Sequence, residues 1–362
     1  MKKVLFIIPS LDIGGTENIC KILFQEFLFK KKYDVDLFVL NKKRNNNFYY
    51  ELNKEYRKKI IFSNNYNWLE IFIKLISLTA VKNYASILAF NNETGFVVNI
   101  IKILFIRKFK TVLRVNNSIK KKIKYSNNFY DTCFKKFYNY FSLNLSDIII
   151  AQSKEMKNEI SEYLINKEKI EVINNLLSKN FKENICFKEK EKYLLFVGSL
   201  TRKKNPLMLL DIYNQFNKNN TQNIKLKIIG DGSELEIMQN FIFLNNLEEN
   251  VEIIKAIPQV KLQKYYSKAL CLIICSKYEG FPNVAIESLF CGTPLLASKC
   301  IGGIKELIQD DINGISFEEY TIDSYLKGLN KLLNYDFNYI KIKETSKRFR
   351  VDKIIPKYEN IL

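Results

Sequence analysis

The sequence predicts an α/β protein built from two doubly wound domains. Short continuous apolar runs alternate with segments of helical periodicity, and this alternation begins again in the second half of the chain. The length of 362 residues exceeds what one hydrophobic core usually serves. Hydrophobic residues make up 47% of the chain and charged residues 26%, which is typical of a globular protein able to bury sizeable cores.

The first half opens with a β-α-β unit. Residues 2–9 (KKVLFIIP) form a buried strand pattern, residues 14–31 carry apolar residues at helical spacing, and residues 33–40 predict a second strand. Further strands are predicted at residues 84–90, 109–115 and 146–153. The opening run resembles a signal peptide only as far as Pro9, and no small-residue cleavage site follows it.

The second half repeats this pattern after a polar connection rich in Asn, Lys and Glu over residues 169–192. Its strands are predicted at 192–199, 224–229, 251–256, 269–276, 294–298 and 314–317, with helices between them. We therefore expect one domain over 1–175, a second over 176–340, and a C-terminal helix within 341–362. That helix either closes the second core or crosses back to the first domain.

Composition excludes several kinds of chemistry. The chain contains no histidine, which rules out imidazole bases, Ser-His-Asp triads and His-rich metal sites. Its seven cysteines include no C-x-x-C pair, so we expect reduced thiols in a cytosolic protein and no metal site. Charged residues interrupt the apolar region 67–90, so no spanning segment is predicted. The net charge of +19 favours an acidic partner, such as a nucleic acid, an anionic membrane or a phosphorylated substrate.

The stretch YEGFPNVAIESLFCGTP at residues 278–294 is the strongest candidate for chemistry. A buried strand precedes it, and a helix ending at Gly292 follows the Gly-Phe-Pro turn. Glu279 then lies at the carboxyl end of a strand, where ligands bind in open α/β sheets, and Pro282 suits the first helical turn. Glu287 lies further into the helix. The alternative is that Glu279 is an ordinary turn acid and Glu287 a solvated helix residue.

The segment EGFPNVAIE resembles the E-x7-E element of retaining glycosyltransferases, and the whole stretch is similar to glycosyltransferase family 4. The resemblance implies a GT-B fold, in which two Rossmann-like domains face a central cleft with the acceptor side in the first domain and the nucleotide-sugar donor side in the second. It assigns Glu279 to the donor sugar and Glu287 to the ribose hydroxyls. The intervening backbone, which would help to hold sugar and phosphate, comprises Gly280, Phe281, Pro282, Asn283 and Val284.

Two further motifs match the family in order along the chain. Gly14 and Gly15 in PSLDIGGTEN resemble the first glycine loop, where the backbone would approach the diphosphate. FVGSLTRKKNP occupies the place of the family's G-R-L-x3-K element: Lys204 matches its lysine, whereas Ser199 stands in place of its arginine. Arg202 could substitute, since charge developing on the diphosphate must be stabilised without a metal. Otherwise this is only a solvated basic loop.

Asn116 stands where relatives often carry a histidine beside the sugar. An amide can hydrogen-bond a sugar but cannot transfer a proton. The front-face route to retention, in which a donor phosphate oxygen takes the acceptor proton, needs no histidine. Lys255, where many relatives have glycine near the base, leaves the nucleobase contacts open.

A basic and aromatic region spans residues 102–137, and its only acid is Asp131. Its cations include Arg107, Lys108, Lys110, Arg114, Lys120, Lys121, Lys122, Lys124 and Lys135, and its aromatics include Phe109, Tyr125, Phe129, Tyr130, Phe134 and Phe137. Docking on an anionic membrane would use both kinds of side chain. No nucleic-acid module accompanies the charge. The alternative is a solvated surface in a lysine-rich protein.

These observations predict a retaining, metal-independent glycosyltransferase that needs no cofactor. It would move a sugar from a nucleotide-sugar, UDP-linked rather than GDP-linked, to a glycan or lipid-linked acceptor in bacterial surface polysaccharide, lipopolysaccharide or glycoprotein glycan synthesis. We expect it in the cytoplasm, peripheral on the inner face of the cell membrane, without a nucleic-acid partner. The alternatives are a sugar-nucleotide epimerase of the same fold and a non-catalytic, basic membrane-binding protein. A dehydrogenase is disfavoured because IGGTEN lacks the G-x-G-x-x-G spacing.

Overall fold

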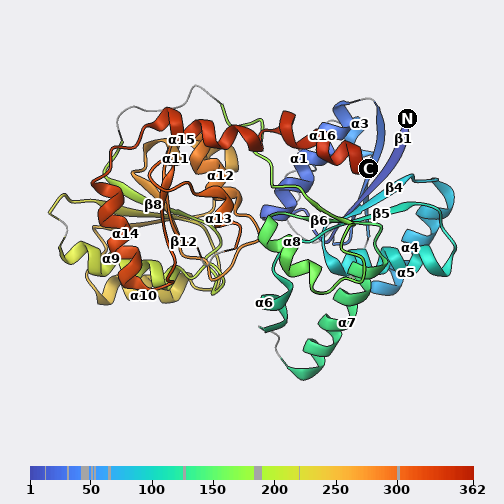
Figure 1. Ribbon diagram of the computed structural model, residues 1–362, viewed down its shortest axis with the longest axis horizontal. Helices are drawn as coiled ribbons and strands as arrows, with labels where there is room; N and C mark the ends of the chain where they lie inside the picture. Colours follow the sequence, from blue (N-terminus) through green and yellow to red (C-terminus); the bar gives the residue numbers. More distant parts are fainter. Residues whose placement is uncertain are drawn as a thin grey trace. The chain divides into compact units, whose positions relative to one another are not determined.

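The computed structural model of the protein describes residues 1–12, 14–30, 32–41, 49, 52, 54–63, 67–124, 128–182, 190–219, 221–299 and 302–362. The chain divides into two compact units, one formed by Met1–Asn175 with Asp352–Leu362 and the other by Leu176–Val351. Each unit is a parallel β-sheet covered by helices, so the predicted α/β, doubly wound fold class is confirmed (Figure 1).

The sheet of the first unit has seven parallel strands in the order β3-β2-β1-β4-β5-β6-β7. They are β1 (Lys2–Ile8), β2 (Tyr33–Val39), β3 (Ile60–Phe62), β4 (Ser86–Ala89), β5 (Lys110–Arg114), β6 (Ile148–Ala151) and β7 (Ile170–Val172). The helices are α1 (Gly15–Phe29), α3 (Lys54–Arg57), α4 (Trp68–Val81), α5 (Asn92–Leu104), α6 (Ile119–Lys124), α7 (Phe129–Leu145), α8 (Lys154–Ser161) and α16 (Val351–Ile361). The strand order reverses between β1 and β4, which is the switch point of a doubly wound sheet.

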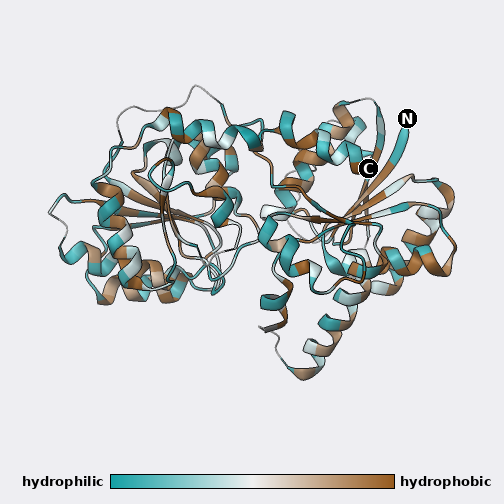
Figure 2. Cartoon of the chain, viewed as in Figure 1, coloured by the Kyte–Doolittle hydropathy of each residue, from teal (hydrophilic) through white to brown (hydrophobic). Residues whose placement is uncertain are grey.

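Strand β1 shows how the first core is built. Its side chains alternate between the two faces of the sheet. Leu5 and Ile7 pack in one buried cluster with residues of α4 and α5, whereas the ring of Phe6 meets that of Phe27 in α1 at a centroid distance of 5.6 Å. Because both faces are covered, the strand is a continuous apolar run from Val4 to Ile8, after the two exposed lysines that are teal beside the N-terminus in Figure 2.

The sheet of the second unit has six parallel strands in the order β10-β9-β8-β11-β12-β13. They are β8 (Tyr193–Val197), β9 (Lys225–Ile229), β10 (Val251–Ile254), β11 (Cys271–Ile274), β12 (Leu295–Ser298) and β13 (Gly314–Phe317). The helices are α9 (Pro206–Lys218), α10 (Leu235–Leu244), α11 (Gln259–Lys268), α12 (Asn283–Phe290), α13 (Ile304–Leu307), α14 (Ile322–Leu333) and α15 (Tyr339–Ser346), followed by the 3-10 turn η1 (Lys347–Phe349).

The second core follows the same rule of alternation. Leu194 and Phe196 of β8 pack with residues of α9, α10 and α14, and Leu195 packs on the other face with residues of α11 and α12. The switch point lies between β8 and β11, which places the loops after these two strands side by side at the carboxyl edge of the sheet.

The end of the chain, where we expected one helix over 341–362, contains three elements. Residues up to Ser346 complete α15, η1 follows, and α16 begins only at Val351. The break occurs at Arg350, whose backbone is extended and forms a parallel bridge with Leu177. Beyond it, residues 352–362 group with the first unit, where the backbone oxygen of Leu362 accepts a hydrogen bond from Ser86 Oγ at 2.9 Å.

The predicted connection over 169–192 begins with a strand that we did not expect. β7 pairs only with β6 and lies at the edge of the sheet, and its Glu171 is exposed. An edge strand tolerates polar residues because one of its sides faces solvent, so the polar composition concealed it. Residues 183–189 of this connection lie outside the described part of the chain.

Candidate active site

The loop between β11 and α12 carries Glu279 at the carboxyl edge of the second sheet. Phe281 and Pro282 in this loop are buried. Pro282 is the N-cap residue of α12, one position before the first turn in which we expected it, and Gly292 with φ +71 lies just beyond the end of the helix, as predicted. Glu279 and the first turn of α12 thus follow β11 at the sheet edge where ligands bind in this class of fold.

Glu279 is a buried carboxylate with three polar neighbours. Only 8% of the residue is exposed. Its Oε1 accepts hydrogen bonds from Ser276 Oγ at 2.7 Å and from Lys204 Nζ, and its Oε2 lies 3.9 Å from Lys203 Nζ. Burial would raise the pKa of Glu279, but the Lys204 and Lys203 ammonium groups outweigh that effect and hold the pKa below its ordinary value. Glu279 is therefore ionised and is not an ordinary exposed turn acid.

Two lysines share this single carboxylate. The side chain of Lys204 is 19% exposed and that of Lys203 is 31% exposed. Lys203 Nζ also lies 4.9 Å from the ring centroid of Tyr278, and burial lowers the pKa of Lys203, although Glu279 opposes this shift. With two cations against one anion, the cluster carries a local excess of positive charge, which suits an anionic ligand such as a diphosphate.

Glu287 lies on α12 and is only 5% exposed. Its Oε2 accepts a hydrogen bond from the Tyr266 hydroxyl at 2.8 Å, and its Oε1 accepts one from Gln259 Nε2 at 2.5 Å. Burial raises the pKa of Glu287, and these two hydrogen bonds oppose that shift. The alternative of a solvated helix residue is therefore wrong. Because a carboxylate offers about four acceptor positions, Glu287 retains capacity for two hydroxyl donors.

A glycine turn supports the Glu279 loop from behind. Gly302 has φ +47, and a Cβ on it would lie 2.0 Å from the backbone oxygen of Glu279. A Cβ on Gly303 would lie 2.5 Å from the backbone oxygen of Gly280. Larger residues at either position would displace the loop, so the two glycines fix the position of the Glu279 backbone.

Ser199 and Arg202 lie in the loop between β8 and α9, the same loop that carries Lys204. Ser199 is exposed. The side chain of Arg202 is 85% exposed, and its Nε lies 3.7 Å from Glu234 Oε1. In this conformation Arg202 pairs with Glu234, whereas Lys203 lies beside Glu279.

Gly14 and Gly15 lie in the first unit, where Gly14 is the N-cap residue of α1 and Gly15 its first residue. A Cβ on Gly14 would lie 2.1 Å from Glu17 Oε2. Burial raises the pKa of this Glu17 carboxyl group. The two glycines carry no side chain, which leaves room for the Glu17 carboxyl group at the start of α1, where backbone N–H groups favour an anion.

Asn116 follows β5 in the first unit and belongs to a network centred on Arg114. Arg114 is only 1% exposed. Its Nη1 donates to Asn116 Oδ1 at 2.5 Å, its Nη2 donates to Asn175 Oδ1, and its Nε donates to the Tyr358 hydroxyl at 3.2 Å. Asn116 Nδ2 also donates to the backbone oxygen of Phe90. The amide is thus held in one orientation, with one hydrogen and one lone pair left over.

The sequence analysis did not predict four of the residues that contact Glu279 and Glu287, namely Lys203, Ser276, Gln259 and Tyr266. Lys203 had a usable signal, because it adjoins Lys204 in the same basic loop. A backbone hydrogen bond of 2.8 Å from Lys277 N to the oxygen of Lys203 joins this loop to the Glu279 loop. Gln259 and Tyr266 come from α11, and nothing in their spacing links them to Glu287.

No three His, Cys, Asp or Glu side chains in the described ranges of the chain come together as a group that could hold a metal ion. No helix described there combines the length and apolar character required to cross a bilayer.

Comparison with known proteins agrees with this geometry. The family model described as Glycosyl transferases group 1 matches residues 178–350, and the model Glycosyltransferase Family 4 matches residues 13–178. An uncharacterized glycosyltransferase of Haemophilus influenzae is 26% identical over 100% of both chains. The N-acetylgalactosamine-N,N'-diacetylbacillosaminyl-diphospho-undecaprenol 4-alpha-N-acetylgalactosaminyltransferase of Campylobacter jejuni is 26% identical, with 93% of this chain and 91% of the relative covered. The crystal structure of Anabaena HepE in complex with UDP and glucose matches with a TM-score of 0.78 and 17% identity over 99% of each chain.

The fold and the two family matches define a GT-B glycosyltransferase, which confirms the predicted fold class and the resemblance. Between them the two models span residues 13–350. The chain belongs to the glycosyltransferases related to family 4.

Proposed function

We propose that this glycosyltransferase moves a sugar from a UDP-sugar to a lipid-linked or glycan acceptor, with retention of configuration and without a metal ion or other cofactor. The observation that carries the proposal is the buried Glu279 carboxylate with two lysine ammonium groups at the carboxyl edge of the second sheet. A nucleotide-sugar presents a diphosphate and several hydroxyl groups, and this cluster offers cations for the first and a carboxylate for the second.

Lys204 and Lys203 would hold the diphosphate. Negative charge grows on this group as the bond to the sugar breaks, so fixed cations stabilise the transition state more than the ground state. The backbone from Gly280 to Val284, where α12 begins, would add N–H donors. Arg202, whose guanidinium is exposed at the same loop, is our proposed third cation, and Ser199 would donate its hydroxyl nearby.

The two acids would recognise different parts of the donor. Glu279 would accept hydrogen bonds from the sugar, and Glu287 would accept them from the two ribose hydroxyls with its remaining lone pairs. From the first unit, Gly14 and Gly15 would let the backbone approach the diphosphate, and Asn116 would hydrogen-bond a sugar hydroxyl. These roles come from the resemblance and, for Glu287 and Asn116, from the hydrogen-bonding positions that their described contacts leave unused.

Retention of the anomeric configuration needs no histidine in this mechanism. The bond between the sugar C1 and the phosphate oxygen breaks with its electron pair going to the leaving UDP. The acceptor oxygen forms its bond to C1 on the same face and passes its proton to a phosphate oxygen of the donor. The protein's groups hold the reactants and stabilise charge, and no side chain has to transfer a proton.

The acceptor proposal draws on the relatives. The Campylobacter jejuni enzyme, by its name, acts on a glycan carried by diphospho-undecaprenol. We infer a similar lipid-linked acceptor here, in the synthesis of a bacterial cell-envelope glycan on the cytoplasmic face of the membrane. The UDP in the matching Anabaena structure supports a UDP-sugar donor.

The outer surface of α4, α5 and α7 supports membrane docking. Large apolar side chains that are at least 40% exposed there include Leu69, Ile73, Val81, Ile103, Leu104, Phe105, Ile106, Phe129, Tyr130, Phe134, Phe137 and Tyr140. Figure 2 shows brown residues along these helices. Apolar and aromatic side chains of this kind, interleaved with lysines, suit the interface of an anionic bilayer.

The basic region contributes less to this surface than its sequence suggests. Arg114 and Phe109 point inward, with 1% and 4% exposure. Lys102 pairs with Asp147 at 2.6 Å, and Lys135 pairs with Asp131 at 2.6 Å. The side chains of Lys122, Lys124 and Tyr125 lie outside the described part. The exposed aromatic and aliphatic side chains are therefore the main support for docking.

The test is turnover with a panel of UDP-sugars and a synthetic polyprenyl diphosphate glycan in anionic vesicles, with and without a chelator. We expect release of UDP only when acceptor is present, no effect of the chelator, and a product with the anomeric configuration of the donor by NMR. An inverted product would overturn retention. Loss of turnover with the chelator would overturn metal independence.

A further inference from the structure

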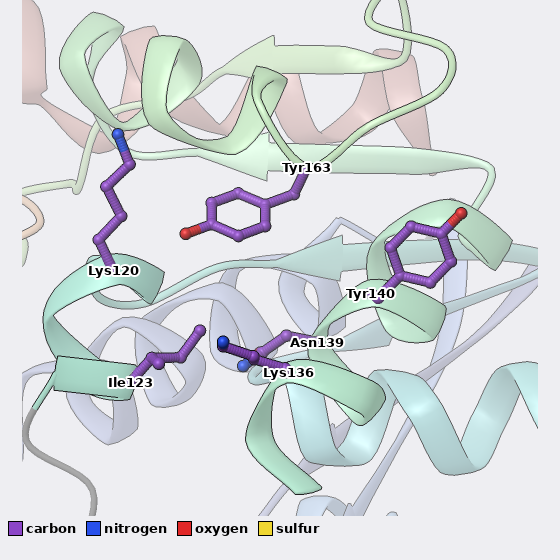
Figure 3. A pocket seen from close by; sticks show the side chains of 6 residues that line it. All are labelled: Lys120, Ile123, Lys136, Asn139, Tyr140 and Tyr163. Carbon is purple, nitrogen blue, oxygen red and sulfur yellow. The ribbon is translucent and has the colours of Figure 1, made fainter. Parts of the chain in front are cut away.

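Tyrosine side chains serve different purposes in this molecule. In the first unit, Tyr140 and Tyr163 line a hollow of about 450 Å³, and their rings form part of its wall (Figure 3). In the second unit, the hydroxyl groups of Tyr213 and Tyr325 donate hydrogen bonds of 2.9 and 2.6 Å to backbone oxygens in the core. Tyr320 has a further use, because its hydroxyl joins two loops of the candidate active site.

Tyr320 lies between β13 and α14 and belongs to neither of these two loops. Its hydroxyl accepts a hydrogen bond from Asn205 Nδ2 at 2.9 Å and donates one to the backbone oxygen of Cys275. Asn205 directly follows Lys204 in the first loop. Cys275 begins the second loop, four residues before Glu279. One hydroxyl group thus connects the loop that supplies the cations with the loop that supplies the carboxylate.

The backbone of Asn205 has a conformation that needs support. Its φ of +52 and ψ of +53 are left-handed, and a residue with a Cβ keeps this conformation only where its surroundings hold it. Asn205 is the N-cap residue of α9, yet its side chain makes no capping bond to the helix. Its Nδ2 reaches Tyr320 instead, and it also lies 3.4 Å from Met208 Sδ, a weak acceptor. Because the N–H of Asn205 donates to the oxygen of Thr201 at 3.1 Å, the bond to Tyr320 holds the end of a turn over residues 201–205, which we call the lysine turn.

The lysine turn carries both cations of the donor site. Lys204 Nζ donates to Glu279 Oε1, and Lys203 Nζ lies 3.9 Å from Glu279 Oε2. The N–H of Lys277 donates to the backbone oxygen of Lys203 at 2.8 Å, so the turn contacts the Glu279 loop there. Two ammonium groups that share one carboxylate also repel each other, so their positions depend on how firmly the turn is held. Tyr320 holds the turn at its other end.

The ring of Tyr320 is itself fixed by packing. It contacts the apolar clusters on both faces of the second sheet, and its centroid lies 6.2 Å from that of the Tyr325 ring. Groups that act on a bound ligand have to be held within about 0.5 Å of the productive geometry, and side chains locked by packing provide this. The Tyr320 hydroxyl is therefore a fixed point to which both loops are attached.

We propose that Tyr320 is a positioning residue of the donor site, which holds Lys203 and Lys204 at the distance from Glu279 that a bound diphosphate requires. Without the hydroxyl, Asn205 loses an acceptor and the lysine turn moves relative to Glu279, although every charged group is still present. The loss therefore falls on binding of the diphosphate and not on binding of the nucleoside. This inference rests on the proposed function for the identity of the ligand.

The test is a calorimetric titration of UDP and of uridine into the whole chain, with Tyr320→Phe and Tyr325→Phe as a matched pair of variants. Each variant removes one hydroxyl that donates to a backbone oxygen at or just beyond the end of β11, but only the Tyr320 hydroxyl also binds the lysine turn. Tyr320→Phe should weaken UDP binding about ten-fold and leave uridine binding within about two-fold, since the charged groups remain but are less firmly placed.

Tyr325→Phe should leave the ratio of the UDP and uridine affinities within about two-fold of the wild type. Melting temperatures without ligand check that each variant is folded at the temperature of the titration. An equal fall of the ratio in Tyr320→Phe and Tyr325→Phe would overturn the proposal, because loss of any hydroxyl beside the end of β11 would then account for the effect.

The variant Asn205→Gly removes the same hydrogen bond from the other side. Glycine adopts the left-handed conformation of Asn205 freely but supplies no Nδ2 donor. Asn205→Gly should lower the ratio of the UDP and uridine affinities by an amount comparable to Tyr320→Phe, and the double variant should lose no more than either single variant. Additive losses would show that the two residues act separately and would overturn the proposal.

The outcomes distinguish this inference from the proposed function. If the wild type binds UDP and uridine equally, the lysines do not hold a diphosphate, and the proposed function fails together with the role of Tyr320. If the wild type prefers UDP and Tyr320→Phe keeps the whole preference, the role of Tyr320 is wrong and the proposed function stands.

Discussion

The polar groups of the two units are satisfied in different ways. In the second unit, Glu279 and Glu287 are buried, and every oxygen of both carboxylates has a neighbour supplied by a lysine, serine, tyrosine or glutamine. In the first unit, the α5–α7 region leaves three buried atoms without a partner among the described residues, namely Asn99 Oδ1, Asn139 Nδ2 and Ser142 Oγ. The outer surface of the same helices exposes a series of large apolar side chains.

This difference indicates that the two units have separate roles. A site whose charges are already paired and held by neighbours is organised in advance for one chemical group. An exposed apolar surface of this kind is one that a partner outside the chain can cover. We infer that the second unit recognises the diphosphate of the donor, whereas the first unit binds the acceptor and the membrane surface.

The largest effect should come from removing the Glu279 charge. Glu279→Gln leaves Lys203 and Lys204 without their anion and removes a hydrogen-bond acceptor for the sugar, so we expect kcat to fall by about 10²–10³-fold. Steady-state release of UDP measures this. The control Glu252→Gln removes an exposed acid paired with Lys227 at 3.4 Å and should change kcat by less than about two-fold. Equal losses of kcat in the two variants would show that Glu279 contributes no more to turnover than an exposed surface carboxylate.

The next effect distinguishes the two cations beside Lys204. Lys203→Gln should weaken UDP binding about ten-fold, because Lys203 lies at Glu279 and is 31% exposed. Arg202→Gln should weaken it only about two-fold, because the Arg202 side chain is 85% exposed and pairs with Glu234. Calorimetric titration of UDP checks both. A larger loss in Arg202→Gln than in Lys203→Gln would contradict this order and would make Arg202 the main cation for the diphosphate.

The two acids should give stability opposite dependences on pH. The pKa of Glu279 is lowered in the folded state, so its contribution is present above the ordinary value of 4.5 and is lost as pH falls through the folded pKa. The pKa of Glu287 is raised, so the stability it contributes is present below 4.5 and declines as pH rises through the folded pKa.

Melting temperatures of the two variants across the range from about pH 4 to pH 7 test this difference. Relative to the wild type, Glu279→Gln should lose stability mainly at the upper end of the range, and Glu287→Gln should gain it there or remain unchanged. Both variants should lose activity. A loss of stability of equal size in Glu287→Gln at neutral pH would contradict the sign assigned to Glu287.

The smallest effect concerns Ile106 at the end of α5. It is 85% exposed and has φ +48, a conformation that β-branched residues rarely adopt. Because Asn tolerates this conformation better, Ile106→Asn should raise the free energy of unfolding by about 1 kcal/mol. The same change should weaken flotation with anionic vesicles, since an apolar side chain is removed from the docking surface.

Ile237→Asn on α10 of the second unit is the control, because Ile237 is 49% exposed and lies outside the helices that we propose to dock. It should leave flotation unchanged. A stabilised Ile106→Asn variant that still floats like the wild type would show that the exposed end of α5 does not contact lipid.

Much of the second unit could be predicted from the sequence, and much less of the first. The strand, turn and helix around Glu279 follow from local signals, including an apolar run, a Gly-Phe-Pro turn and Gly292. Gln259 and Tyr266 of α11 could not be placed, because their roles depend on which helices meet at the sheet edge. Tertiary contacts of this kind leave no periodicity in the chain.

In the first unit, apolar residues gave a misleading signal. Residues 103–106 (ILFI) form a run that would ordinarily predict burial, yet all four are at least 40% exposed. Conversely, Arg114 belongs to a run of basic residues that predicts a surface, and it is 1% exposed because Asn116, Asn175 and Tyr358 accept its hydrogen bonds. Composition cannot distinguish a core from a docking surface, and it cannot show that a buried network will satisfy an arginine.

The most direct test of the central claim is a calorimetric comparison of UDP with uridine, in the wild type and in the double variant Lys203→Gln/Lys204→Gln. If the two lysines hold the diphosphate, UDP should bind the wild type at least about 100-fold more tightly than uridine, and this ratio should fall below about ten-fold in the double variant. Equal affinities of UDP and uridine for the wild type, or an unchanged ratio in the double variant, would contradict the account.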